Sequence, residues 1–438
     1  MMTKEDCKRK VIEAIEKRAG ELHEIGETIL HHPELGFKEV KTAALVEDKF
    51  RSLGLPYQKG LAVTGVKAHL AGKSRKIHLA IMGELDSILI PSHPFADPQT
   101  GAAHACGHNA SITGMLGAGM GLLDSGVMAE LDGDISLMAV PAEELVELEY
   151  RNRLRQAGRI VFLAGKQEFI RLGLLDDVDM VLMFHLQQAD PVQKISVGAT
   201  MNGCLAKFIR YKGKESHAGG APHLGINALN AALMGMMGIH AQRETFRDED
   251  CVRVHPIITR GGDLVNVVPA DVRLETFVRG RSVEAMQDAN KKVNRALKAG
   301  ALAIGAEVEI TDLPGYLPCL KNDRLDQLFA ANAAALLGTE AIGQAGHLTA
   351  SSDLGDISHL MPTLQPFIKA GRGNLHTEEF VVNDPQLAYV ESAKGLALTV
   401  VDLLGNGAGE GLAIKGNYQA KYSKEEYLQL WQRLCQEG

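Results

Sequence analysis

The sequence is poor in aromatic residues and has neither clustered cysteines nor a long uncharged apolar run. Aromatic residues make up 5% of the 438-residue chain. The six cysteines are widely scattered, which argues against a disulfide framework and favours a reducing compartment. The N-terminus MMTKEDCKRKVIEAIEKRAG lacks an apolar signal core, and no uncharged apolar run of about 18 residues follows. We therefore expect a cytoplasmic protein without membrane contact.

Basic blocks are also absent. The chain has 46 Lys+Arg against 54 Asp+Glu, a net charge of -8, so the electrostatic footprint of a nucleic-acid-binding protein is missing. Hydrophobic residues make up 45% and charged residues 23%, which is typical of a globular protein. Because single cores stop growing near about 250–300 residues, this length predicts two domains. Small molecules or peptides are the expected ligands.

Three short apolar runs in the first half predict buried strands of a mostly parallel sheet, at Ile77–Leu85, Ile135–Val140 and Met180–Phe184. Each run ends in polar residues. These are Glu84 and Asp86, then Glu143 and Glu144, then His185. Ligands of open α/β sheets bind outside the carboxyl ends of the strands, so the three clusters are expected to converge on one site.

The pattern changes near Gly198. Alternating, hairpin-like segments then enclose two helical stretches, at Asn227–Ile239 and Val283–Ile304, in the order β-α-β-β-α-β. The α/β texture resumes after Pro314. Helices are also predicted over Val11–Leu30, and at the C-terminus in YSKEEYLQLWQRLCQ.

Four segments carry metal-competent residues, and each has a structural alternative when taken alone. Cys106 and His108 form a Cys-x-His pair whose side chains would point the same way in an extended loop, although a buried cysteine beside a loop histidine looks identical. The Glu143-Glu144 pair also fits the start of a solvated helix. His185 also fits a core histidine, and His376 means nothing by itself.

Together these residues predict a metal centre. Two metal ions need five or more ligands, and the segments supply five: Cys106, His108, Glu144, His185 and His376. Glu143 is then the expected general base toward a metal-activated water.

Eight motifs in order along the chain resemble peptidase family M20, in its amidohydrolase branch of aminoacylase-like, hippurate-hydrolase-like and aminobenzoyl-glutamate-hydrolase-like enzymes. The motifs are HHPELGF (31–37), GELDS (83–87), HACGHN (104–109), PAEE (141–144), FH (184–185), SHAGGAP (216–222), GG…NVVP (261–269) and NLHTEEF (374–380).

The resemblance implies an α/β fold with a discontinuous catalytic domain, residues 1–197 and 314–438. An α+β, ferredoxin-like lid or dimerisation domain, residues 198–313, interrupts it. The resemblance to this family also implies that the five ligands bind two divalent ions per subunit, zinc or manganese, with cobalt or nickel as alternatives. Glu143 is implied as general base and acid, His217 as an oxyanion-stabilising residue from the lid, and Asn266 as a substrate-binding residue. A homodimer through the lid domain is expected.

Some positions depart from the family pattern. Asn109 stands where many members carry Asp, and Ser111 where many carry His, so the orientation of the metal ligands is in question. His223 replaces a common aromatic residue. The segment Leu145–Gly165 is longer than usual and arginine-rich, which fits a surface helix better than a wall of the substrate entrance.

The function favoured by these observations is metal-dependent hydrolysis of the amide bond in a small N-acyl amino acid or dipeptide. One alternative is an N-carbamoyl amino acid amidohydrolase. Another is an inactive metal-binding homologue that binds a small molecule.

Overall fold

The computed structural model describes residues 2–436, and its largest sheet has six strands. In spatial order they are β1 (Tyr57–Leu61), β2 (Gly65–Leu70), β6 (Gly133–Val140), β3 (Ile77–Glu84), β7 (Met180–Leu182) and β18 (Thr363–Leu364). The pairs from β6 to β18 are parallel, whereas β1 and β2 form an antiparallel edge. The predicted α/β class is confirmed as a mixed α/β fold.

The central strand β3 is apolar throughout because both of its faces are covered. Leu79 and Ile81 join one hydrophobic core, and Ala80 and Met82 join another on the opposite face. Side chains alternate across a strand, so a strand buried on both sides reads as a continuous apolar run. This explains why the sequence signal for β3 was clear.

Helices cover the first face of this sheet. They are α1 (Lys4–Lys17), α2 (Ala19–Leu30), α3 (Val40–Ser52), α4 (His108–Asp124), α9 (Asp323–Leu337), α11 (Ser392–Leu404) and α12 (Gly409–Asn417). The single helix predicted over Val11–Leu30 is wrong. Arg18 leaves helical geometry with φ -95° and ψ 0°, so the chain turns between two amphipathic helices there.

The helix α4 lies close against β3. A Cβ atom on Gly83 would stand 2.8 Å from the Ser111 carbonyl oxygen and from the Ile112 Cα atom. Any larger residue at position 83 would therefore push α4 away from the sheet. This close contact fixes the first turn of α4, which carries His108, against the end of β3.

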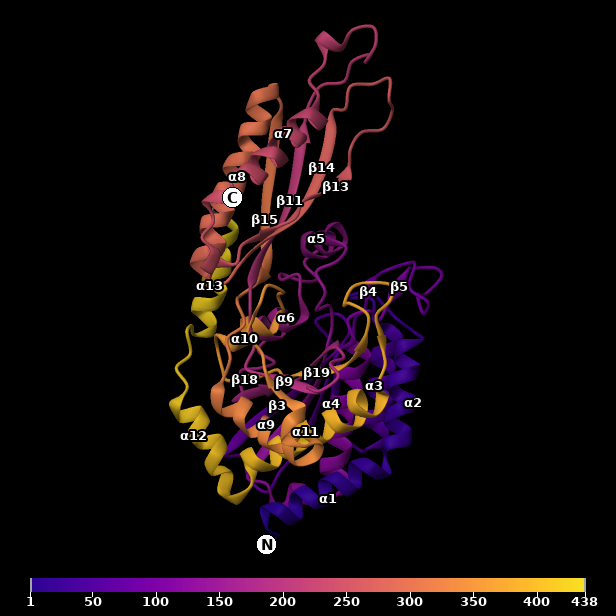
Figure 1. The fold of residues 1–438 in the computed structure, drawn as a ribbon, viewed down its shortest axis with the longest axis vertical. Coiled ribbons are helices and arrows are strands. Elements are labelled where there is room, and N and C mark those ends of the chain that lie inside the picture. Colours follow the sequence, from indigo (N-terminus) through magenta and orange to yellow (C-terminus); the bar gives the residue numbers. More distant parts are fainter. Residues whose placement is uncertain (1, 437–438) are drawn as a thin grey trace.

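On the opposite face lie shorter helices and the C-terminal helix. They are α6 (Gly165–Arg171), α10 (Leu354–Ser358) and α13 (Lys424–Gln436). The helix α5 (Leu148–Gln156) stands apart from them, between the two halves of the molecule in Figure 1.

The segment after Met201 forms a second, separate sheet. Its main order is β12 (Arg253–Val254), β14 (Asp271–Gly280), β11 (Gly203–Lys212) and β15 (Glu307–Tyr316), and β13 (Ile257–Arg260) also pairs with β14. The helices α7 (Ala228–Ala241) and α8 (Val283–Ile304) pack against each other and on this sheet. Figure 1 shows it rising above the first sheet, with α13 beside its base.

A third sheet contains β16 (Ile342–Gln344), β9 (Ile195–Val197), β19 (Phe367–Arg372) and β20 (Val381–Val382), with β8 (His185–Gln188) paired to β19. The strand pairs β4 (Ile88–Leu89) with β5 (Ala102–Ala103) and β10 (Thr200–Met201) with β17 (His347–Leu348) complete the strands. The prediction that His185 closes the third strand of the first sheet is therefore wrong. It begins β8 because the chain leaves that sheet after Leu182.

Within residues 2–436, no helix is long and apolar enough to cross a membrane. All six cysteines are free thiols.

Candidate metal centre and active site

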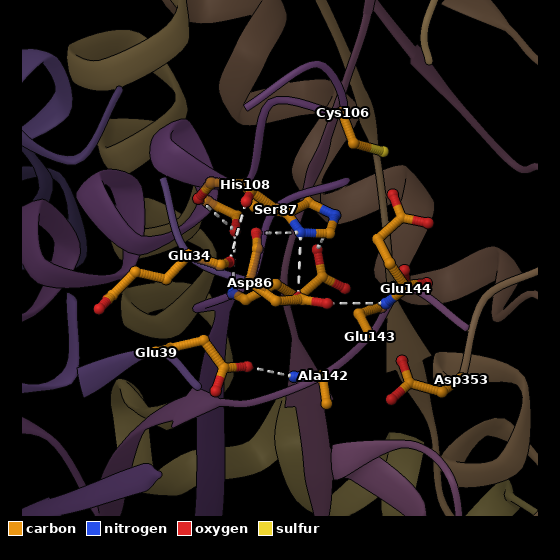
Figure 2. Close-up of polar contacts among 12 residues, drawn as sticks. Glu34, Glu39, Asp86, Ser87, Cys106, His108, Ala142, Glu143, Glu144 and Asp353 are labelled. Carbon is orange, nitrogen blue, oxygen red and sulfur yellow. Dashed lines mark hydrogen bonds and ion pairs between the residues drawn. The ribbon is translucent and has the colours of Figure 1, made fainter. Parts of the chain in front are cut away.

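His108, the first residue of α4, is held by Asp86 at the end of β3. Its Nδ1 atom lies 2.9 Å from the main-chain oxygen of Asp86 and 3.3 Å from Asp86 Oδ1. A carbonyl oxygen only accepts hydrogen bonds, so Nδ1 carries the proton and Nε2 is left as a free ligand atom. Figure 2 shows Asp86 beneath the imidazole ring.

Cys106 lies in the loop before α4, and two histidines converge on it. Its Sγ atom is 3.2 Å from His185 Nε2 and 3.2 Å from His376 Nε2. The Nδ1 atom of His185 lies 2.7 Å from the Leu186 main-chain oxygen, which again leaves Nε2 free. The extended Cys-x-His loop predicted from sequence is wrong, because Gly107 is left-handed (φ 86°) and His108 already begins the helix.

Glu144 follows β6 and completes the cluster. Its main-chain N–H donates to Asp86 Oδ2 at 2.9 Å, and its Oε1 atom lies 3.0 Å from His376 Nε2. Asp86 thus fixes two ligands, His108 through its ring and Glu144 through its backbone. Sequence reasoning noted Asp86 at the strand end but gave it no role.

The five predicted ligands come together as two groups that share Cys106. Cys106, His108 and His185 present ligand atoms within 4.8 Å of one another, and so do Cys106, Glu144 and His376. His108 Nε2 and Glu144 Oε1 are buried and make no hydrogen bond, although Glu84 Oε2 lies 3.3 Å from the first atom and His376 Nε2 lies 3.0 Å from the second. Buried polar atoms are normally hydrogen-bonded, so two such ligand atoms that face one cluster fit a cation.

Charge within the cluster favours a thiolate. Burial and the Glu144 carboxylate raise the pKa of Cys106, but His185, His108 and His376 outweigh them and lower that pKa to about 6. The thiolate is the form of cysteine that binds metals. A soft ligand is therefore ready at the centre of the cluster.

Glu143 lies beside Glu144 but in a different environment (Figure 2). Burial, followed by the neighbouring carboxylates of Glu84, Glu144 and Asp353, raises the pKa of Glu143 well above its usual range. The pKa of Glu144 is lowered instead, because His376 and His108 overcome its burial. Two adjacent carboxyl groups with opposite shifts fit one ligand and one proton carrier.

A buried ion-pair network lies next to Glu143. Lys166 on α6 is fully buried, and its Nζ atom lies 2.6 Å from Glu84 Oε1 and 2.5 Å from Asp353 Oδ1. Sequence analysis missed Lys166 and Asp353 because neither belongs to a motif. Only the fold brings α6 and the segment before α10 to the end of β3.

The two family departures in α4 serve packing. Asn109 Nδ2 donates to the Gly26 carbonyl oxygen (3.3 Å) and to Tyr389 Oη (3.1 Å), so it joins α4 to α2 and to the segment before α11. Ser111 Oγ accepts from the Glu84 N–H at 2.9 Å and donates to the His108 carbonyl oxygen at 3.0 Å. Ser111 thus connects β3 directly to the first turn of α4.

His217 and Asn266 lie together, but away from this cluster. The Ala218 N–H donates to the Asn266 carbonyl oxygen at 2.9 Å, and His217 pairs with Val267 in an isolated bridge. Cys204, near the start of β11, lines the pocket beside the metal ligands, whereas His217 follows the other end of β11, which is Lys212. Ten strand residues span about 30 Å. The structure therefore does not bring His217 to the pocket of its own chain.

The pocket beside the cluster has a volume of about 350 Å³. Its wall contains Glu143 and four of the five ligands, Cys106, Glu144, His185 and His376. The rest of the wall mixes polar residues with apolar ones, which include Met201, Phe277, Leu348 and Phe367.

Arg279 on β14 also lines the pocket and stacks over Phe277 at 5.4 Å. Within residues 2–436, Arg279 has no carboxylate partner, so a cationic group faces the pocket unpaired. The alternating pattern of β14 predicted a strand but did not identify this arginine as functional.

The long segment after Glu144 divides its arginines between surface and interior. Arg153 and Arg159 are exposed, as the surface-helix interpretation predicts, but Arg151 is 1% exposed. For Arg151 that interpretation is wrong, because its buried guanidinium donates to the main-chain oxygens of Ala142, Glu144 and Leu163.

Comparison with known proteins identifies the family to which this candidate metal centre belongs. The model of peptidase family M20/M25/M40 matches residues 80–393. Xaa-Arg dipeptidase of Mus musculus is 27% identical over 96% of this chain and 94% of its own. N-acyl-L-amino acid amidohydrolase of Geobacillus stearothermophilus is 28% identical over 76% and 85%, respectively.

A solved dinuclear metal-binding peptidase of the M20 family from Bacillus subtilis shares the fold. Its TM-score is 0.65 at 23% identity, over 89% of this chain and 99% of that one. The family model matches most of the chain, so the protein belongs to peptidase family M20/M25/M40. The resemblance predicted from the motifs is confirmed. The protein is a metal-dependent hydrolase of amide bonds.

Proposed function

We propose that the protein hydrolyses the amide bond of a small N-acyl amino acid or dipeptide at a two-metal centre. The observation that carries this proposal is the convergence of five ligand residues from separate segments around Cys106. The proposed ligands are Cys106, His108, Glu144, His185 and His376. Because a thiolate is a soft ligand, zinc is favoured, and manganese, cobalt and nickel are the alternatives.

Metal ions held by these five residues would supply Lewis-acid polarisation of the substrate carbonyl and would lower the pKa of water. Glu143 would accept a proton from the attacking water and deliver it to the leaving nitrogen. Burial, followed by the carboxylates of Glu84, Glu144 and Asp353, raises the pKa of Glu143 well above its usual range, which favours keeping the transferred proton on the carboxyl group until the leaving nitrogen takes it. Burial of Glu143 keeps bulk water from competing for the proton.

Arg279 is proposed to bind the carboxylate of the substrate. An unpaired guanidinium in a largely apolar pocket binds a carboxylate through two parallel hydrogen bonds. The apolar residues beside it would receive an acyl group or side chain. Both curated relatives described above are named for substrates of this kind.

The division into domains is also proposed. Residues 1–197 and 314–438 would form the catalytic domain, and residues 198–313 a lid or dimerisation domain. Its separate sheet and its apolar surface support this division, because Leu233, Met234 and Met237 are exposed along one stretch of α7. Large exposed apolar residues in a row mark an interface, and a second copy of this chain is the proposed partner.

Dimerisation would also supply His217 and Asn266 to the site. Their position at the far end of β11 leaves them outside their own pocket. The neighbouring Leu264 and Val265 are highly exposed. We propose that His217 of one subunit stabilises the oxyanion and Asn266 binds substrate in the other subunit. The free cysteines are consistent with a reducing, cytoplasmic location.

The test is a Glu143→Gln variant assayed on acyl amino acids, dipeptides and carbamoyl amino acids. Loss of the proton carrier is expected to lower kcat by about 10²–10⁴-fold. Metal content, measured by plasma emission spectrometry, should stay unchanged. Glu425→Gln, at an exposed glutamate on α13, is the matched control. Unaltered turnover in Glu143→Gln, or a wild-type protein that binds no metal, would contradict the proposal. Release of ammonia and carbon dioxide would point to carbamoyl substrates.

A further inference from the structure

Arg151 is the most deeply buried arginine of the long segment after Glu144, and the proposed chemistry gives it no task. It lies on α5 and is 1% exposed. No carboxylate within residues 2–436 pairs with it. Burying a charge without a partner of opposite sign is costly. The hydrogen bonds that Arg151 does make must therefore offset this cost and indicate its function.

Those contacts are main-chain carbonyl oxygens on both sides of Glu143. The Nη1 atom donates to the Ala142 oxygen at 3.1 Å and to the Leu163 oxygen at 2.5 Å. The Nη2 atom donates to the Glu144 oxygen. One planar group therefore holds the residue before Glu143 and the residue after it. The rigid planar fork of an arginine presents its donors in a fixed geometry, whereas a lysine ammonium is a compact charge on a flexible stem.

Other side chains hold the remaining backbone groups of this loop. Glu39 Oε1 accepts from the Ala142 N–H at 2.8 Å, and Tyr316 donates to the Glu143 carbonyl oxygen. Figure 2 shows the Glu39 contact below the loop. Ala142 also has a positive φ of 56°, a strained geometry for a residue with a Cβ atom. The loop keeps this shape because side chains hold its polar groups.

The Arg151 guanidinium is closely packed by residues before α3. A Cβ atom on Gly36 would stand 2.4 Å from Arg151 Nη2, and the ring of Phe37 lies 5.3 Å from the guanidinium carbon. Gly36 and Phe37, at the end of the HHPELGF motif, thus lie against the Arg151 guanidinium.

We propose that Arg151 is a positioning residue for Glu143. By holding the Ala142 and Glu144 carbonyls, it fixes where the Glu143 carboxyl group points relative to the metal ligands. This inference rests on the proposed role of Glu143 as proton carrier. A displacement of about 1 Å of a catalytic group costs on the order of 10²-fold in rate.

The test compares Arg151→Met with Arg153→Met, which removes an exposed arginine from the same helix. We expect Arg151→Met to lower kcat by about 10–10²-fold, with KM within about threefold of wild type. Hydrogen exchange by mass spectrometry should rise in the peptide that covers residues 141–147. Arg153→Met should change neither quantity.

Chemical rescue separates positioning from general stability. Guanidinium ion at millimolar concentration should restore part of kcat in Arg151→Ala and should leave Arg153→Ala unchanged. If Arg151→Met does not fold, the same measurements on Arg151→Lys apply. Wild-type kcat and wild-type exchange in a folded Arg151 variant would overturn the proposal. The exchange measurement needs no substrate, so it tests the loop even if the proposed hydrolysis is wrong.

Discussion

Asp86 is the residue on which the geometry of the metal ligands depends most. Its Oδ1 atom lies 3.3 Å from His108 Nδ1, which also faces the Asp86 main-chain oxygen, and its Oδ2 atom accepts from the Glu144 N–H. Partners that orient metal ligands usually contribute about 10–100-fold to metal affinity. Asp86 acts on two ligands at once, so the upper part of that range is expected.

The corresponding variant is Asp86→Ala. We predict a loss of about 10²-fold in metal affinity, measured by competition with a chromophoric chelator. Asp177→Ala, at an exposed aspartate, serves as control. Equal affinities in wild type and Asp86→Ala would show that the ligands orient themselves without Asp86.

Arg279 gives a prediction about substrate recognition. Replacing it by Met removes a charge-assisted hydrogen bond worth about 1.5–3 kcal/mol, so KM for a substrate with a free carboxylate should rise about 10–10²-fold. The matching carboxamide substrate should lose far less, because it carries no charge. Arg281→Met, at an exposed arginine just beyond the same strand, is the control. A similar loss for both substrates would mean that Arg279 does not bind the carboxylate.

The residues also show where sequence reasoning ends. Cys106, His108 and Glu144 belong to motifs, so their types and spacing predicted them. Arg151 and Lys166 do not, since their partners are carbonyl or carboxylate groups brought close only by folding. His185 was expected in the site, but on the wrong strand. Sequence spacing gives no sign that the chain changes sheets after Leu182.

Among the elements, strands buried on both faces were the easiest to predict. β3 and β6 match their apolar runs closely, and α8 spans the predicted Val283–Ile304. The short strands, such as β18 and β20, gave no signal, because two residues are too few to show a period. The break between α1 and α2 was missed because the apolar spacing continues across Arg18.

The C-terminal helix α13 is attached through a buried carboxyl group. Asp356 Oδ1 accepts from Tyr427 Oη and Trp431 Nε1, each at 2.9 Å. Burial nevertheless raises the pKa of Asp356 to about 7, although these hydrogen bonds oppose the shift. The folded protein therefore binds this proton more tightly than the unfolded chain does.

This difference makes the free energy of unfolding depend on pH. A raised pKa contributes stability that is fully present below about pH 4 and is lost as the pH rises through about 7. Asp356→Asn cannot ionise, so we predict that its free energy of unfolding falls less than that of wild type between pH 5 and pH 8. The difference should be about 1–3 kcal/mol, measured by urea titration at each pH. Identical pH profiles would contradict it.

For the whole molecule, the arrangement of the second sheet determines which residues can meet. Cys204, Phe277 and Arg279 reach the pocket at one end of that sheet. His217 and Asn266 lie beyond its other end. Sequence order alone places all of these residues in the same insertion and does not show that a strand length separates them. The domain boundaries and the dimer remain predictions.

Complementation between inactive subunits tests whether His217 acts in the partner's site. Glu143→Ala lacks the proton carrier, and His217→Ala lacks the oxyanion donor, which is expected to cost about 10²–10³-fold in kcat. In a mixed dimer, the subunit that keeps Glu143 would receive His217 from its partner, so one intact site forms. Random pairing places about one quarter of all sites in this state. Co-expressed variants with different affinity tags should therefore recover about one quarter of wild-type activity per site, whereas Glu143→Ala paired with the Glu143→Ala/His217→Ala double variant should recover none. If His217 instead reaches its own pocket by a movement of the second sheet, the first mixture will stay as inactive as its components.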